Sequence, residues 1–174
     1  RHALAAGNDA LAIGHASQCL LDIAREGRLS EAREWIRRLP LQAIQRDVQL
    51  QLSVAWVTAV SDDAAKVPLM MERIRQHPQF NDEHRFMAAL VSAAAGVFCD
   101  QPGRIIEALE GWDRVPEWAP PLFMQAWANS KGNLAYLCGD FEGARQLLAT
   151  SLSSMSREPG MRLALGYGDM ILGL

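Results

Sequence analysis

His15 and Cys19 are the two side chains whose types and spacing come nearest to a metal site. They lie four residues apart in a predicted helix, so both project from one face, where an imidazole and a thiolate could bind zinc. A structural zinc ion needs four ligands, and no second pair of cysteines or histidines completes this set. Both residues also fall in an apolar stripe. Packing in the core is therefore the favoured interpretation, and no cofactor is predicted.

A second group of titratable residues surrounds the start of a helix near residue 81. His77 and His84 flank a loop and could meet, but no nucleophile or third catalytic group accompanies them. Asp82 and Glu83 follow the helix cap Asn81, where acidic residues offset the positive end of the helix dipole. The sequence also lacks a phosphate-binding loop, a nucleophile elbow and a His-Glu-x-x-His motif. We therefore predict that the chain is not an enzyme.

Basic residues do not form a surface for nucleic acid. The formal net charge is −3, and acidic and basic residues are interspersed. The densest basic cluster has glutamates among its arginines, as a solvated helix face does. Its arginines are Arg28, Arg33, Arg37 and Arg38. We expect no direct contact of this chain with nucleic acid.

Composition favours a globular, cytoplasmic chain. The hydrophobic fraction of 49% is ample for a buried core. Cys19, Cys99 and Cys138 are odd in number and lie far apart in apolar helical runs, which predicts reduced, buried thiols. The longest nearly apolar run, residues 88–99, is too short to cross a bilayer. The chain opens without methionine and ends on an apolar helix, so we expect a single domain, residues 1–174, cut from a longer protein.

The stretch from Gly132 to Leu148 indicates how these residues are positioned. It predicts a helix, a tight turn at Gly139 and a second helix that begins at Asp140. Gly132 lets the two helices approach closely, and Ala144 keeps them close one turn into the second helix. This order of small residues is typical of a tetratricopeptide-like helical pair.

The same order recurs along the chain. Turn positions fall at residues 27, 62, 100 and 139, with Asp62 and Asp100 in the place of glycine. Such steady intervals predict a helical-repeat solenoid, in which each pair buries its apolar face against its neighbours. We expect an all-α fold of about nine helices, four antiparallel pairs and the first helix of a fifth. The predicted helices are 9–25, 31–39, 41–60, 66–77, 82–99, 102–115, 121–138, a helix from Asp140 and one after Gly160, with Ser30 capping the second and Pro68 in the first turn of the fourth.

In a stack of such pairs the first helices line a concave groove, which is the candidate binding site. Aromatic and methionine side chains beside amides suit a small ligand or a peptide of mixed polarity. The alternative is that Trp56 and Phe98 pack between neighbouring pairs. Amides are costly to bury without partners, which favours Asn129 and Asn133 as binding residues, together with Tyr136. The predicted groove residues are Gln49, Trp56, Met87, Phe98, Asn129, Asn133 and Tyr136, with Leu52, Leu90, Ala94, Ser17 and Leu21 at related positions.

The chain resembles the helical-repeat region of MalT-type, LuxR-family transcriptional regulators. The resemblance is carried by Leu39-Pro40, by residues 52–56 (Leu-Ser-Val-Ala-Trp), by the helix-turn-helix of residues 132–144 and by residues 162–166. It covers nearly the whole chain, although other bacterial tetratricopeptide proteins share most of these motifs. The aspartates in the place of turn glycines and Pro68 depart from the pattern.

The resemblance implies a large regulator with an ATPase module and a DNA-binding helix-turn-helix, neither of which lies in this chain. The repeat region would then bind a small-molecule inducer or a regulatory protein and relay that event to the other modules. The alternative is a generic tetratricopeptide scaffold that binds a peptide in the same groove. Self-association stays open. A closed pocket of a few hundred cubic ångströms would favour a small ligand, and an open groove would favour a peptide.

Overall fold

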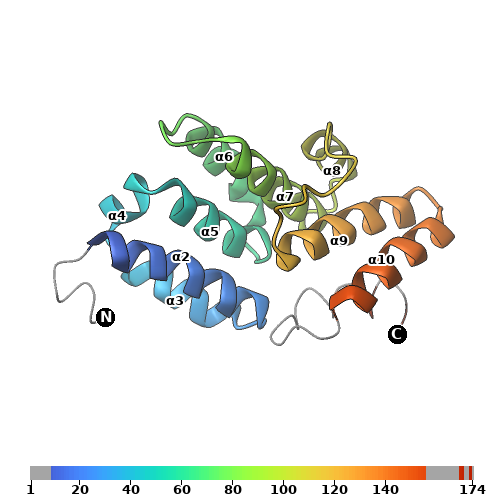
Figure 1. Ribbon diagram of the computed structural model, residues 1–174, viewed down its shortest axis with the longest axis horizontal. Helices are drawn as coiled ribbons and strands as arrows, with labels where there is room; N and C mark the ends of the chain where they lie inside the picture. Colours follow the sequence, from blue (N-terminus) through green and yellow to red (C-terminus); the bar gives the residue numbers. More distant parts are fainter. Residues whose placement is uncertain (1–8, 156–168, 171–172, 174) are drawn as a thin grey trace.

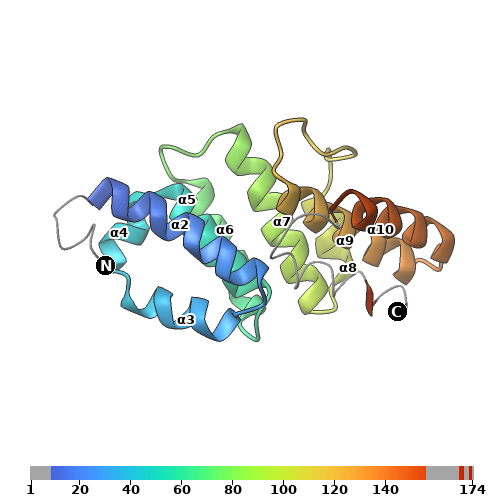
Figure 2. The same ribbon diagram turned by 60° about the horizontal axis from the view of Figure 1, so that its bottom comes forward.

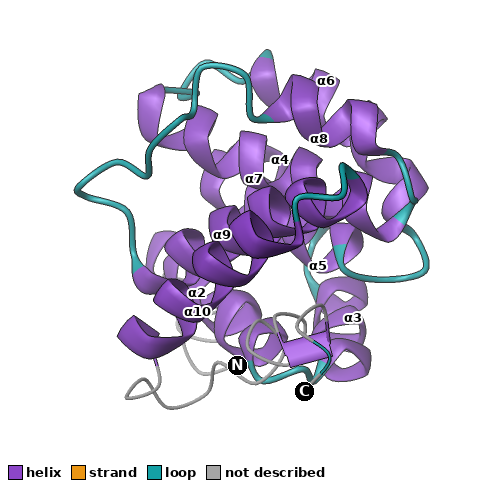
Figure 3. Cartoon of the chain, turned by 90° about the vertical axis from the view of Figure 1, so that its right-hand side faces the viewer, coloured by secondary structure: helices purple, strands orange, loops and turns teal. Residues whose placement is uncertain are grey.

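The computed structural model describes residues 9–155, 169, 170 and 173, and this part of the chain is all-α (Figures 1 and 3). It contains nine α-helices, one 3₁₀ helix and no strand. In order they are α2 (Asp9–Arg25), α3 (Leu29–Arg38), α4 (Leu41–Arg46), α5 (Val48–Ala59), η1 (Ala64–Lys66), α6 (Val67–Arg75), α7 (Asp82–Phe98), α8 (Pro102–Ala108), α9 (Pro121–Leu137) and α10 (Phe141–Met155). None of these helices is long and apolar enough to cross a membrane.

The helices are arranged as four successive pairs. α2 packs on α3, α5 on α6, α7 on α8 and α9 on α10 (Figures 1 and 2). The first helices also pack on one another in chain order, α2 on α5, α5 on α7 and α7 on α9. The second helix of each of the first three pairs contacts the first helix of the next pair. The predicted pairing of helices is therefore present throughout residues 9–155.

Three of the four predicted turns have the expected backbone. Gly27 and Gly139 adopt φ of 78° and 80°, the left-handed conformation that ends a helix at little cost for glycine. Asp100 adopts φ of 53° and so does occupy a glycine place. Asp62 does not, because the chain there passes through a turn into η1 without a positive φ.

Helix caps explain where several elements begin. Asn81 Oδ1 accepts a hydrogen bond from His84 N (3.1 Å), and Asn81 N donates one to His84 Nδ1 (3.2 Å), which together form a capping box. Asp140 caps α10, since its Oδ1 accepts from Gly143 N at 2.9 Å. Pro68 lies in the first turn of α6, where a proline breaks no helical hydrogen bond. These predictions are confirmed.

Other predicted boundaries are wrong. The expected helix 41–60 is broken at Asp47, which is extended (φ −126°, ψ 115°) and accepts a hydrogen bond from Leu50 N at 2.7 Å. Ser30 is not a cap, because α3 already begins at Leu29. α8 stops at Ala108 instead of residue 115, and Gly111 (φ 78°) then turns the chain into a loop. The helix expected after Gly160 falls largely outside the described residues.

Two glycines bring paired helices into close contact. A Cβ atom at Gly132 of α9 would lie 2.9 Å from Leu148 Cγ of α10, and Leu148 is fully buried. A Cβ atom at Gly96 of α7 would lie 2.9 Å from Ile105 Cγ1 of α8. The predicted role of Gly132 is thus confirmed. For the third pair the close contact is at Gly96, one turn after the small residue Ala93 that the repeat pattern indicated.

We expect Gly132→Val to lower the free energy of unfolding by about 1–3 kcal/mol, because the added atoms must displace Leu148 from a filled core. Gly14→Val is the matched control. Gly14 also lies within a helix but has no atom within 4 Å of its would-be Cβ, so its substitution should change stability by less than about 0.5 kcal/mol. Urea denaturation followed by circular dichroism measures both. Equal effects would contradict the close approach of α9 and α10.

Candidate functional site

The first helices of all four pairs meet at one apolar recess of about 70 Å³. Three of the predicted groove residues line it, namely Trp56 of α5, Phe98 at the end of α7 and Asn129 of α9. α2 contributes Ala24 and Arg25. The structure therefore brings together residues that lie far apart in the sequence. The remaining lining residues are Val60, Ala94, Val97, Leu122, Ala126 and Ser130.

Trp56 and Phe98 differ in how far they are exposed. Trp56 is 5% exposed, and its ring lies 6.2 Å from that of Phe123, measured between centroids. Phe98 is 47% exposed. Trp56 is thus largely a core residue with one edge at the recess, whereas Phe98 presents much of its ring to an occupant. The alternative that these aromatics pack between neighbouring pairs holds for Trp56.

The buried amide of Asn129 has a structural partner. Asn129 Oδ1 accepts a hydrogen bond of 2.8 Å from Gln125 Nε2, one turn earlier in α9. Gln125 is fully buried and Asn129 is 9% exposed. Satisfying two polar groups away from water accounts for this amide pair without a ligand.

The other predicted groove residues do not line the recess. Gln49 Nε2 lies 3.5 Å from Met87 Sδ, and Met87 is buried, so these two form a separate contact between α5 and α7. Tyr136 is exposed at the far end of α9, with its ring 5.4 Å from that of Phe141. Asn133, half-buried on α9, is also absent from the lining. At related positions Leu52 and Leu90 are fully buried, Ser17 is buried and Leu21 is half-buried, while Ala94 does line the recess.

The histidine and cysteine predictions need correction. His15 is exposed rather than packed in the core, and Cys138 is exposed rather than buried. Cys19 and Cys99 are only half-buried. His77 Nδ1 accepts a hydrogen bond from Gln79 N at 3.2 Å. Among the described residues no three histidine, cysteine or acidic side chains are grouped so that they could hold a metal ion.

The basic cluster on α3 is a solvated face, as predicted. Arg37 and Arg38 both pair with Glu34, and the hydrogen bond from Arg38 is the main cause of the lowered pKa of that carboxyl. Arg33 forms an ion pair of 3.0 Å with Asp63, which joins α3 to the turn after α5. Arg28 pairs with glutamates at positions 26 and 31. Exposed pairs of this kind contribute little to stability.

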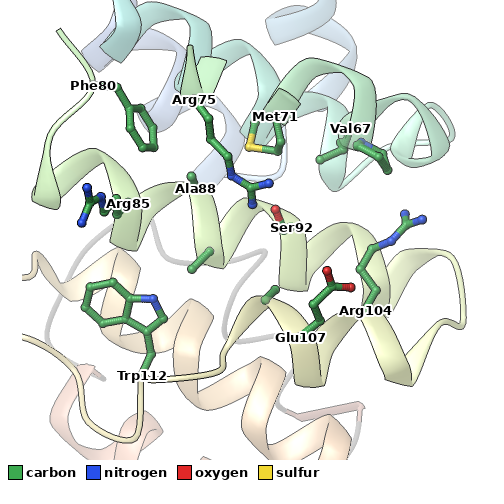
Figure 4. Close-up of a pocket in the computed structure, with 13 residues that line it drawn as sticks. Val67, Met71, Arg75, Phe80, Arg85, Ala88, Ser92, Arg104, Glu107 and Trp112 are labelled. Carbon is green, nitrogen blue, oxygen red and sulfur yellow. The ribbon is translucent and has the colours of Figure 1, made fainter. Parts of the chain in front are cut away.

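A larger pocket, of about 560 Å³, opens between α6, α7 and α8 (Figure 4). It lies on a different face of α7 from the recess, since it is lined by residues 85, 88, 89 and 92 of that helix instead of 94, 97 and 98. Arg75 reaches into it from α6, and Arg104 and Glu107 stand on α8. The remaining lining residues are Val67, Pro68, Met71, Phe80, Ala108 and Trp112.

This pocket was not predicted from the sequence. Its three arginines, Arg75, Arg85 and Arg104, lie 10 and 19 positions apart in the sequence. Taken singly, each is expected to be an ordinary surface residue. Little in the sequence indicates that these arginines share a pocket. Arg75 and Arg104 each have a glutamate three positions away, as arginines of the solvated face do, so each is expected to pair on the surface. α6, α7 and α8 form three sides of the pocket. The fourth side is Trp112, which the loop 109–120 brings over α7.

The loop that carries Trp112 is held at two points. Trp127 Nε1 of α9 donates a hydrogen bond of 2.9 Å to the carbonyl oxygen of Trp112. The rings of Trp112 and Phe86 lie 4.8 Å apart between centroids, and Phe86 is fully buried. The wall of the pocket is therefore anchored to the core.

Comparison with known proteins found no matching family model, no matching curated protein and no matching solved structure.

We expect Asn129→Leu and Gln125→Leu each to lower the free energy of unfolding by about 1–3 kcal/mol, because each removes one side of a hydrogen bond between buried amides. The double variant should cost less than the sum of the two, since it removes both polar groups together. A double-mutant cycle from urea denaturation tests this. Additive costs would contradict a direct structural pairing of the two amides.

Proposed function

We propose that this chain is the sensing domain of a LuxR-family, MalT-type transcriptional regulator, built as a tetratricopeptide-like solenoid. In this proposal a regulatory partner binds where the first helices meet, and the event is relayed to ATPase and DNA-binding modules elsewhere in the protein. The support for the family is the resemblance in residues 39–40, 52–56 and 132–144. The support for a solenoid is the packing of α2, α5, α7 and α9 in succession.

The observation that carries the sensing role is the shared recess. An occupant placed beside Trp56, Phe98 and Asn129 would contact all four helical pairs at once. A ligand shifts a conformational equilibrium only by its difference in affinity between states, and contacts to several pairs make that affinity depend on how the pairs are stacked. In a stack where each pair contacts its neighbours, such a change passes along the array.

Between an inducer and a regulatory protein, the size of the recess favours the protein. Sites for small molecules commonly enclose about 300–1,000 Å³, whereas this recess has about 70 Å³. That volume suits one apolar side chain of a partner, inserted against Phe98 as an anchor, with the rest of the contact outside it. The proposed occupant is therefore an amphipathic helix or peptide segment of a protein partner.

The test is thermal and chemical stability of the 174-residue chain with a panel of amphipathic peptides, sugars, amino acids and aromatics. A peptide present at about a hundred times its dissociation constant should add about 2.7 kcal/mol to the free energy of unfolding. We expect Phe98→Asp to abolish that gain, because a carboxylate would be buried in an apolar recess. Leu69→Asp is the control, since Leu69 is an exposed apolar residue of α6 (56%, against 47% for Phe98) and lines neither the recess nor the pocket between α6, α7 and α8.

A peptide effect that survives Phe98→Asp would contradict this placement of the partner. A small molecule whose effect is lost in Phe98→Asp would instead make the site that of an inducer. The alternative function is that of a generic scaffold. The protein sequence encoded on either side of this segment distinguishes the two. A phosphate-binding loop upstream and a helix-turn-helix downstream are expected for the regulator, and their absence would leave the scaffold.

A further inference from the structure

We propose that the pocket between α6, α7 and α8 binds a small organic oxyanion, a carboxylate or phosphate carried on an apolar or aromatic body. This inference does not rest on the proposed function, because it concerns a different face of α7. The pocket has a volume of about 560 Å³, which is within the range of small-molecule sites. It is several times larger than the recess where the first helices meet, which has about 70 Å³.

The charge of the pocket is positive although the chain is negative. Three arginines line it, from α6, α7 and α8, against the single carboxylate of Glu107. The chain as a whole has a formal net charge of −3. Arginine guanidinium groups bind carboxylate and phosphate oxygens through paired N–H donors. The three stand along the cavity, with Arg75 between Arg85 at one end and Arg104 at the other, so an anion near the middle would meet Arg75 and Arg104 first (Figure 4).

Two of these arginines lack the acidic partners found elsewhere on the protein. Arg75 and Arg104 form no ion pair with any residue that the structure describes. Arg104 Nη1 is buried and has no hydrogen-bond acceptor there. A buried charged donor without an acceptor is unfavourable, and a bound oxyanion would supply the acceptor. Arg85 is paired with Asp82 (3.1 Å), and its side chain is 67% exposed, so it contributes positive charge at the rim of the pocket.

The other walls define the body of the ligand. Met71, Ala88 and Ala89 form an apolar floor, and Phe80 and Trp112 stand at the end nearest Arg85 (Figure 4). Apolar and aromatic walls with a few converging polar groups are the usual composition of a small-molecule site. A ligand that is only an inorganic ion would leave these walls uncovered. The pocket therefore selects an anion that also carries apolar surface.

Isothermal titration calorimetry of the 174-residue chain tests the proposal with three probes of similar size. Phenyl phosphate and 3-phenylpropionate present the two oxyanions, and 3-phenyl-1-propanol is the neutral control. We expect at least one anion to bind about tenfold or more tightly than the alcohol, because it alone supplies charged acceptors to the arginines. Which anion binds tells phosphate from carboxylate.

Arg104→Met should weaken binding of that anion by about tenfold or more while the chain stays folded, since it removes the buried unpartnered donor and keeps an apolar stem. Arg75→Met is the second variant, should the first unfold the chain by circular dichroism. Arg73→Met is the matched control, because Arg73 is exposed on the same helix, α6, but does not line the pocket. Equal binding of anion and alcohol, no binding of either anion at millimolar concentration, or equal weakening by Arg73→Met would each overturn the proposal.

Discussion

Helices α5 and α7 are buried on almost every side, and the rest of the described structure depends on that constraint. α5 buries nine of its residues, including neighbours such as Leu52, Ser53, Val54 and Ala55 that point in all directions around the helix. α7 buries ten. A helix that is apolar all round needs cover on all sides. α2, α6, α8 and α9 supply this cover, and their placement creates both the recess and the larger pocket.

The elements that could be predicted from the sequence are those that depend on local interactions. Gly27, Gly139 and Asp140 determine turns and caps through the backbone of a few residues, so their roles follow from residue type. The break at Asp47 was missed because residues 41–60 keep a helical pattern on both sides of it. Asp47 is of a residue type that favours the start of a helix, and it does cap α5, but this local sign is outweighed in a pattern that continues on both sides.

The candidate site divides in the same way. Trp56, Phe98 and Asn129 were predicted because the first helix of each repeat faces its neighbours at regular positions, and the structure places these three together. Tyr136 and Asn133 do not line the recess, because they lie nearer the C-terminal end of α9 than Asn129 does, where Tyr136 contacts Phe141 at the turn into α10. The pocket between α6, α7 and α8, here called the arginine pocket, could not be predicted from neighbouring residues in the sequence. Its walls depend on the gap between α6 and α8, which is a property of the packing of whole helices.

Because α7 lines both cavities, an occupant of one is expected to affect the other. Ser92 and Arg85 face the arginine pocket, while Ala94 and Phe98 face the recess. α7 is one continuous helix from Asp82 to Phe98, so a shift of it along or about its axis changes both linings together. Any such coupling is reciprocal: an anion that favours one position of α7 changes the affinity for a partner by the same factor as the partner changes the affinity for the anion.

The distribution of ion pairs separates the surface arginines from those of the pocket. The paired arginines of α3 and α10 find their carboxylate partners close by in the chain or at an adjoining turn. On α10 the hydrogen bond from Arg145 is the main cause that lowers the pKa of Glu142 to about 2. Arg104 has Glu107 three positions after it, whereas Arg145 has Glu142 three positions before it, and Arg104 forms no such pair in the described part of the chain. Arg75 has Glu72 three positions before it, in the same order as Glu142 and Arg145, and it too forms no ion pair with a described residue, so sequence spacing alone does not decide which pairs form. At the pocket, Arg104 Nη1 is buried without an acceptor among the described residues, which leaves this donor available to an anion from outside.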